Sequence, residues 1–129
     1  MVVLDLKYPI ACGVIEDWDV MEKVWHYTFY TLLGITPSEV KGVLINVTPL
    51  SPFDDIKDLT RIMFEAFEVR SLYIANASVM SLLASGRSSG IVVDSGYDVS
   101  YSSPIFEGFI IKQAFKKMEI AGSHITEYC

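Results

Sequence analysis

Residues 71–96, SLYIANASVMSLLASGRSSGIVVDSG, contain the pattern in this chain that is most informative about its fold. Two apolar runs, at residues 71–76 and 91–94, are bounded by turn residues, which is typical of strands buried inside a sheet. Residues 77–84 lie between these runs and predict a short helix that stops near Gly86. A strand, a helix and a second strand in this order indicate an α/β domain.

The segments before this stretch continue the alternation of strands and helices. Residues 42–47, GVLINV, predict another central strand, and we expect this strand and the next one along the chain to be buried on both faces. Residues 17–33 predict a helix that Asp17 or Asp19 can cap. Residues 54–67 predict a second helix, whose apolar stripe consists of Ile56, Leu59, Ile62, Met63, Phe64 and Phe67.

The two ends of the chain contain further predicted elements. Residues 2–6 predict a short strand. Residues 99–103 and 105–111 predict antiparallel strands of a meander, and residues 122–128 predict the first turns of a helix. We therefore expect a single α/β domain over residues 1–129, with a mixed sheet, flanking helices and a C-terminal antiparallel meander.

The composition argues against several classes of protein. The net charge of −6 disfavours a general nucleic-acid binder, because nucleic-acid backbones attract basic surfaces. No apolar run reaches the ~18 residues that indicate a membrane span, and the start of the chain lacks the features of a signal peptide. We therefore expect a cytoplasmic protein without a membrane segment, in which Cys12 and Cys129 are free thiols.

Four stretches of the chain carry a resemblance to a known protein family. They are LKYPI (6–10) followed by Gly13, DWDVMEKVWHYTFY (17–30), PLSP (49–52) with IMFE (62–65), and residues 81–96 from SL through ASGR to GIVVDSG. PIFEG (104–108) and Ala121-Gly122 continue the match. Together these stretches resemble the actin and actin-related protein family over almost the whole chain, and residues 17–30 are nearly diagnostic.

The resemblance implies a partial actin-like fold of the ribonuclease H-like type. Residues 1–90 resemble part of the first large lobe of the family, and residues 91–129 resemble the start of the second lobe. The family's N-terminal hairpin, with its first phosphate loop, has no counterpart here, and neither do the later segments that hold adenine. The match therefore covers roughly a third of the family fold.

A nucleotide site is implied by the resemblance at Asp94, Ser95 and Gly96, which are similar to the start of the family's second phosphate loop. An acid at a strand end can act on the hydration shell of Mg²⁺, and a glycine lets backbone N–H groups approach phosphate. The family continues with an acid and a glycine, where this chain has Tyr97 and Asp98. We therefore favour a turn without nucleotide; ATP with Mg²⁺ is expected only if this loop still functions.

Two further positions indicate that the chain is not an ATPase. Ala77 stands where the family has a glutamine that positions the attacking water, and alanine has no donor or acceptor. Tyr101 stands where the family has an assisting histidine. The neighbouring Asn76 is a poor substitute, because the helix register should turn its side chain elsewhere. We therefore expect no catalytic residues.

A protein partner is the remaining implication. Phe106, Phe109, Ile110 and Ile111 match a loop that lies near a partner-binding groove in actins, and they form either core packing or a contact surface. Because the family's N-terminal hairpin pairs into the same sheet, the chain is expected to have an open sheet edge. We expect a protein partner or self-association to cover that edge.

These observations leave three hypotheses about function. The first is a non-catalytic structural or interaction subunit of a cytoskeletal or actin-containing assembly, cytoplasmic and associated with the cytoskeleton. The second is an ATP-binding fragment of an actin-like cytoskeletal ATPase. The third is a truncated gene product without a dedicated role, although the intact strand and helix patterning argues for maintained folding. Ala77, Tyr97 and Tyr101 favour the first hypothesis.

Overall fold

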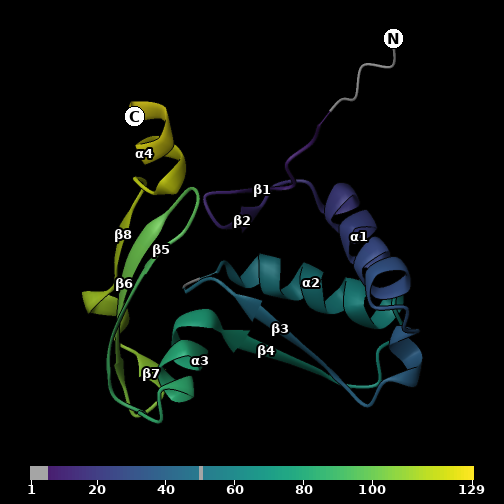
Figure 1. Ribbon diagram of the computed structural model, residues 1–129. Helices are drawn as coiled ribbons and strands as arrows, with labels where there is room; N and C mark the ends of the chain where they lie inside the picture. The colour runs from purple at the N-terminus through teal and green to yellow at the C-terminus, as the bar shows by residue number, and fades with distance from the viewer. Residues whose placement is uncertain (1–5, 50) are drawn as a thin grey trace.

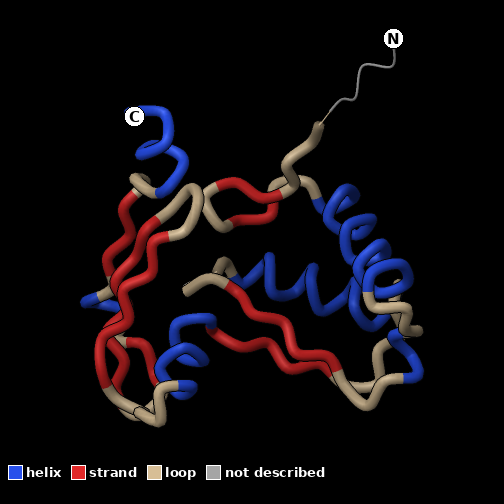
Figure 2. Tube along the Cα trace, in the orientation of Figure 1, coloured by secondary structure: helices blue, strands red, loops and turns tan. Residues whose placement is uncertain are grey.

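Small separate sheets and four α-helices make up residues 6–49 and 51–129, the part of the chain that the computed structural model describes (Figure 1). The predicted α/β class is confirmed. The parallel and the antiparallel strands, however, lie in different sheets rather than in one mixed sheet (Figure 2). The predicted strand at residues 2–6 falls outside the described residues, apart from Leu6, which belongs to no strand.

The first sheet is a hairpin that the sequence did not predict. Strands β1 (Ile10–Ala11) and β2 (Val14–Ile15) pair in antiparallel fashion. The two residues between them, Cys12 and Gly13, both have positive φ values, of 48° and 79°. A two-residue connection with positive φ at both positions is typical of a tight hairpin turn, and it suits the twist of the two strands.

The first predicted helix is confirmed, together with its cap. Helix α1 (Trp18–His26) continues as a π-helical segment, η1 (Tyr27–Leu32). The Asp17 side chain accepts a hydrogen bond from the Val20 N–H, with 2.9 Å between Oδ1 and the nitrogen. Asp17 rather than Asp19 therefore satisfies one of the free donors at the helix start.

The parallel pair of strands carries the hydrophobic core. Strands β3 (Val43–Val47) and β4 (Leu72–Asn76) pair over five residues, and α2 (Phe53–Glu65) connects them across one face. A short 3-10 helix, η2 (Pro37–Glu39), precedes β3. The buried side chains come from η1, α2 and the turn after α2, and they are Phe29, Leu59, Ile62, Met63, Phe67 and Val69. Leu59, Ile62 and Met63 of the predicted stripe thus pack α2 against both strands, whereas Phe64, also assigned to the stripe, is exposed.

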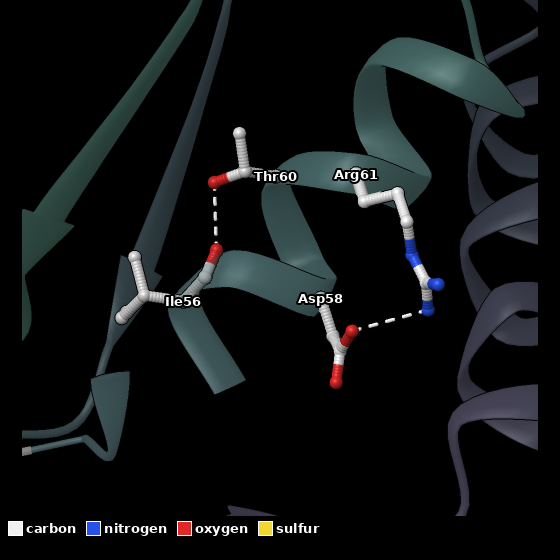
Figure 3. A network of polar contacts seen from close by, with 4 residues as sticks. All are labelled: Ile56, Asp58, Thr60 and Arg61. Atoms are coloured by element: carbon white, nitrogen blue, oxygen red, sulfur yellow. Dashed lines mark hydrogen bonds and ion pairs between the residues drawn. The ribbon is translucent and has the colours of Figure 1, made fainter. Parts of the chain in front are cut away.

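Two local polar contacts lie along α2 (Figure 3). Arg61 forms an ion pair with Asp58, 3.1 Å apart, and the Thr60 hydroxyl donates to the Ile56 carbonyl. Since both partners of the ion pair are well exposed, the pair contributes at most about 1 kcal/mol to stability. The core face, and not this surface network, therefore holds α2 in place.

The second face of the β3–β4 pair is only partly buried, and this corrects the prediction: Ala75 on that face is buried, but its neighbours are not. Leu44 and Tyr73 point away from α2 and are exposed, whereas Val43, Ile45 and Ile74 pack against the core. Side chains alternate between the two faces of a strand, and α2 covers one face only. Apolar residues on both faces led the sequence analysis to expect cover on both faces, which the described elements do not provide.

The third sheet is an antiparallel meander formed by four strands. They are β5 (Gly90–Ser95), β6 (Ser100–Phe106), β7 (Phe109–Ile110) and β8 (Lys116–Met118), with the 3-10 helix η3 (Lys112–Ala114) before β8. Strand β6 is central, because it pairs with β5 on one side and with β7 and β8 on the other. Helix α4 (Gly122–Tyr128) follows and confirms the prediction for residues 122–128.

Two predictions about the meander were wrong. We expected strands at 99–103 and 105–111, separated near Pro104, but β6 runs through Pro104 and the turn lies at Glu107-Gly108. The Pro104 carbonyl accepts from the Ile111 N–H, so the main chain of Pro104 faces away from β5, and its missing N–H costs no bond in the β5–β6 ladder. Strand β5 was expected to be buried and is largely exposed.

A buried hydroxyl pair joins the parallel part of the fold to the meander. Helix α3 (Ala77–Ala84) connects β4 to β5, and its Ser78 donates a hydrogen bond to Ser103 of β6, with 2.9 Å between the oxygens. Both side chains are almost completely buried. A buried hydroxyl group is costly unless it is hydrogen-bonded, so each serine requires the other.

We expect Ser78→Ala and Ser103→Ala each to lower the free energy of unfolding by about 1–3 kcal/mol, because each leaves a buried hydroxyl without its partner. In the double variant both hydroxyls are gone, so its cost should be smaller than the sum of the single costs. Urea unfolding of the four proteins measures these differences. The control is Ser81→Ala, whose exposed hydroxyl bonds only within α3. Strictly additive costs would contradict the coupling.

Candidate functional site

The end of β5 and the start of β6 bring two of the predicted site residues together. Asp94 lies directly opposite Tyr101 in the antiparallel register. The Tyr101 hydroxyl donates a hydrogen bond to Oδ2 of Asp94, at 2.9 Å. Two positions that the sequence analysis treated separately, the acid of the loop and the replaced histidine, are therefore direct partners.

The surroundings of Tyr101 keep its hydroxyl protonated. Burial is the main cause that raises the pKa of Tyr101 to about 12, followed by the hydrogen bond to Asp94 and the charge of that carboxylate. The ring lies 6.0 Å from the ring of Phe115. It also lines a hollow of about 200 Å³, whose other walls include Cys12, Val14, Thr48, Val99 and Lys117. Near neutral pH Tyr101 is thus a hydrogen-bond donor and not a base.

The hydroxyl of Ser95 is also engaged within the chain. Ser95 Oγ lies 2.8 Å from Ser100 Oγ, and Ser100 Oγ donates to the Ile120 carbonyl at 2.6 Å. A serine has one hydroxyl hydrogen, and Ser100 gives its own to Ile120. Ser95 is therefore the donor in the first contact, and its proton is not available to a ligand.

The Gly96 turn is tied to the first turn of α4. The Gly96 N–H donates to the Val99 carbonyl at 3.0 Å, and the Gly96 carbonyl accepts from the Gly122 N–H at 3.0 Å. Ser123 donates to the Tyr97 carbonyl through both its N–H and its hydroxyl, each at 2.8 Å. The main-chain donor of Gly96 is thus already used, and the exposed ring of Tyr97 projects from the turn.

Glycine at position 96 is not required by the backbone. Gly96 is not among the residues with positive φ, and a β-carbon there would meet only the Val99 carbonyl, at 3.5 Å, an ordinary contact distance. A phosphate-binding nest depends on successive N–H groups and usually on a glycine conformation that other residues avoid. This turn has the sequence of the start of such a loop without its backbone geometry.

Ala77 and Asn76 lie on a different element from the turn. Ala77 is the first residue of α3, and its methyl group offers no polar atom. Asn76 caps the same helix, because its Oδ1 accepts from the N–H groups of Ser78 and Val79 at 3.1 and 3.5 Å. The side-chain oxygen of Asn76 is therefore occupied by the cap.

A metal ion would find few ligands at this place. Asp94 is the acidic side chain at the end of β5, and Tyr101 already donates to one of its oxygens. Within residues 6–49 and 51–129, no three histidine, cysteine, aspartate or glutamate side chains gather in a group that could hold a metal ion.

The candidate partner residues lie on the β6–β7 hairpin. Phe106 and Phe109 face each other across the Glu107-Gly108 turn and are 62% and 79% exposed. Ile111 is also exposed, while Ile110 is half-buried and borders a hollow of about 360 Å³. Of the two alternatives for these residues, core packing is wrong for Phe106 and Phe109. Both present large apolar surfaces to solvent.

Comparison with known protein families identifies the family of this chain. The family model described as Actin matches residues 2–129. The chain belongs to the actin family. The described helices and sheets are those of part of an actin fold. In the described part of this actin-family chain, no helix is both long and apolar enough to cross a membrane.

Several residues at the site of this actin-family chain were missed by the sequence analysis. Ser100, Phe115 and Ser123 contact Ser95, Tyr101 and Tyr97 respectively, and Ile120 accepts from Ser100; none of these four residues was singled out. Only Ser100 could have been identified from the sequence, because a tight turn after Gly96 places it opposite Ser95. Phe115 directly precedes β8, Ile120 follows it, and Ser123 lies in α4; the positions of these segments depend on tertiary packing.

The Tyr101 hydroxyl should titrate well above an ordinary tyrosine. A folded pKa of about 12, against about 10 in the unfolded chain, means that this contribution to stability is complete below pH 10 and is lost as the pH rises from 10 to 12. The tyrosinate absorbance of the wild type minus that of Tyr101→Phe should therefore show a midpoint near 12. Tyr97→Phe, at an exposed ring, is the matched control. A midpoint near 10 for Tyr101 would contradict the Asp94 contact.

Proposed function

We propose that this actin-family chain is a non-catalytic structural subunit that acts through protein contacts in a cytoskeletal or actin-containing assembly of the cytoplasm. The observation that carries the proposal is the hydrogen bond from Tyr101 to Asp94. The acid that the resemblance assigns to the Mg²⁺ hydration shell is instead bound to a tyrosine of the same hairpin. The neighbouring hydroxyl of Ser95 and N–H of Gly96 also have partners within the chain.

The chemistry of ATP hydrolysis supports the same proposal. Hydrolysis needs groups that orient the attacking water and groups that stabilise the charge of the phosphoryl group. Ala77 has no polar atom with which to orient water. Tyr101 stays protonated near neutral pH and donates to Asp94, so it does not act as a base there. We therefore propose that the nucleotide site is degenerate and the chain is not an ATPase.

Exposed apolar surface supports a role in protein contacts. Phe106, Phe109 and Ile111 are exposed together at one end of the meander. Solvent-exposed clusters of large apolar side chains typically mark interaction surfaces. We propose this end of the β6–β7 hairpin as one contact, and the open strand edges as another. The net charge of −6 favours protein over nucleic acid as the partner.

One observation favours the alternative, an ATP-binding fragment of an actin-like ATPase. Asp94 is exposed at the end of a strand, and the hydrogen bond from Tyr101 occupies only one of its carboxylate oxygens. The other oxygen remains able to accept from a hydrated Mg²⁺ that accompanies ATP. This alternative needs the turn at residues 96–98 to rearrange and release its bonds to Val99 and α4.

Nucleotide binding separates the two functions. We expect a fluorescent ATP analogue at millimolar concentration to show no saturable binding to the purified chain, with or without Mg²⁺, because the Gly96 N–H and the Ser95 hydroxyl already donate within the chain. Asp94→Ala should give the same trace, and a conventional actin in the same buffer is the positive control. Saturable, Mg²⁺-dependent binding that Asp94→Ala removes would overturn the proposal and support the alternative.

A further inference from the structure

The outer edge of β5 presents unpaired main-chain groups to solvent. Among the described strands, β5 pairs with β6 alone. The Pro104 carbonyl is bonded to Ile111 on the far side of β6, so the main chain of Ile91, which lies opposite Pro104, does not point toward β6. Because N–H and C=O groups alternate in direction along a strand, those of Ile91, Val93 and Ser95 all point outward.

This edge lacks the features that protect most edge strands. Natural edges are usually blocked by lysine, proline, a bulge or a covering element. Residues 90–95, GIVVDS, contain no lysine or proline, and their register with β6 is continuous. Ile91 and Val93 are 69% and 76% exposed. The one charged side chain, Asp94, is bound to Tyr101 on the opposite face of the sheet.

The edge of β3 is a weaker candidate for pairing. A hollow of about 210 Å³ borders it, with walls from the β1–β2 hairpin, from α2 and from Met21 and Trp25 of α1. A strand approaching β3 has to enter between these elements. Strand β5 is also longer, with six residues against five in β3. The β5 edge is therefore the more accessible of the two.

We propose that two copies of this chain pair through β5, in antiparallel orientation, around a two-fold axis at Val93. The inference rests on the protein-contact part of the proposed function and names a second copy as the partner. In this register Val93 of one copy faces Val93 of the other, and Ile91 faces Ser95. Each outward N–H and C=O then finds a partner, and the antiparallel meander continues across the axis.

The charges in this register do not oppose pairing with a second copy. Asp94 lies opposite Val92 of the other copy, so no like charges are directly opposed. Ile91 and Val93 of both copies share one face and form a continuous apolar stripe. Pairing along a single strand buries less than the ~1,200 Å² of a standard interface, so we expect a weak dimer that forms at micromolar concentrations.

Sedimentation equilibrium of the 129-residue chain over a range of concentrations tests the proposal. We expect the wild type to shift from monomer to dimer, and Val93→Pro to remain monomeric with an unchanged circular dichroism spectrum. Proline at 93 removes an N–H that the β5–β6 ladder does not use, so the fold should survive. The matched control Val93→Thr keeps the N–H and the β-branch, and it should dimerise within about threefold of the wild type.

A second variant tests the same interface in case the proline variant misfolds. Val93→Lys places two like charges opposite each other at the axis, so the dimer should weaken at least tenfold and recover partly when salt is added. A wild type that stays monomeric at all concentrations overturns the inference. A dimer that survives both Val93→Pro and Val93→Lys also overturns it and points to the β6–β7 hairpin. Nucleotide binding overturns the proposed function alone and leaves the dimer result valid.

Discussion

The packing of α2 on a single face of β3 and β4 is the constraint on which the other features of the molecule depend. The core around Met63 forms between this helix, η1 and one face of two strands. Because the cover is one-sided, Leu44 and Tyr73 remain exposed. The strands then lead through α3 into the meander, where Ser78 and Ser103 fix the junction. A core on one side of the strands thus leaves apolar residues and strand edges exposed, where another protein surface can bind.

At the end of β5, the residues of a family motif form hydrogen bonds within the chain. Asp94, Ser95 and Gly96 keep the residue types of a phosphate loop. Each now has a partner inside the chain: Tyr101, Ser100 and Val99 respectively. A ligand that binds here must compete with bonds already formed, and only the surplus of its own interactions would appear as affinity. Retained residue types therefore do not imply a retained site.

The sequence predicted the parts of the fold with long, regular patterns. Helices α1, α2, α3 and α4 and strands β3 and β4 were placed within one or two residues of their bounds, α1 once its π-helical extension is included. Strands of two or three residues, such as β1, β2 and β8, have no periodicity to detect. The burial of β5 was wrong because an apolar run shows which residues suit a core and not whether another layer covers them.

The candidate site was only partly predictable for a similar reason. The positions of Asp94, Tyr97 and Ala77 follow from sequence, and so does the lack of polar atoms at Ala77. The Asp94–Tyr101 contact depends on the register of β5 with β6, which the misplaced strand break at Pro104 obscured. The bonds from Gly122 and Ser123 depend on where α4 packs, and this is a tertiary property.

The arrangement of strands also has a consequence for the order of folding. The β3–β4 pair joins Val43 to Leu72 across the whole of α2, whereas the meander joins Ser95 to Ser100 and Phe106 to Phe109 through short turns. Contacts between near neighbours close smaller loops and form faster than contacts between distant segments. We therefore expect the meander to form before the parallel pair, in an order that pulsed hydrogen exchange during refolding would resolve. In a growing chain, by contrast, β3, α2 and β4 emerge in that order, before any strand of the meander.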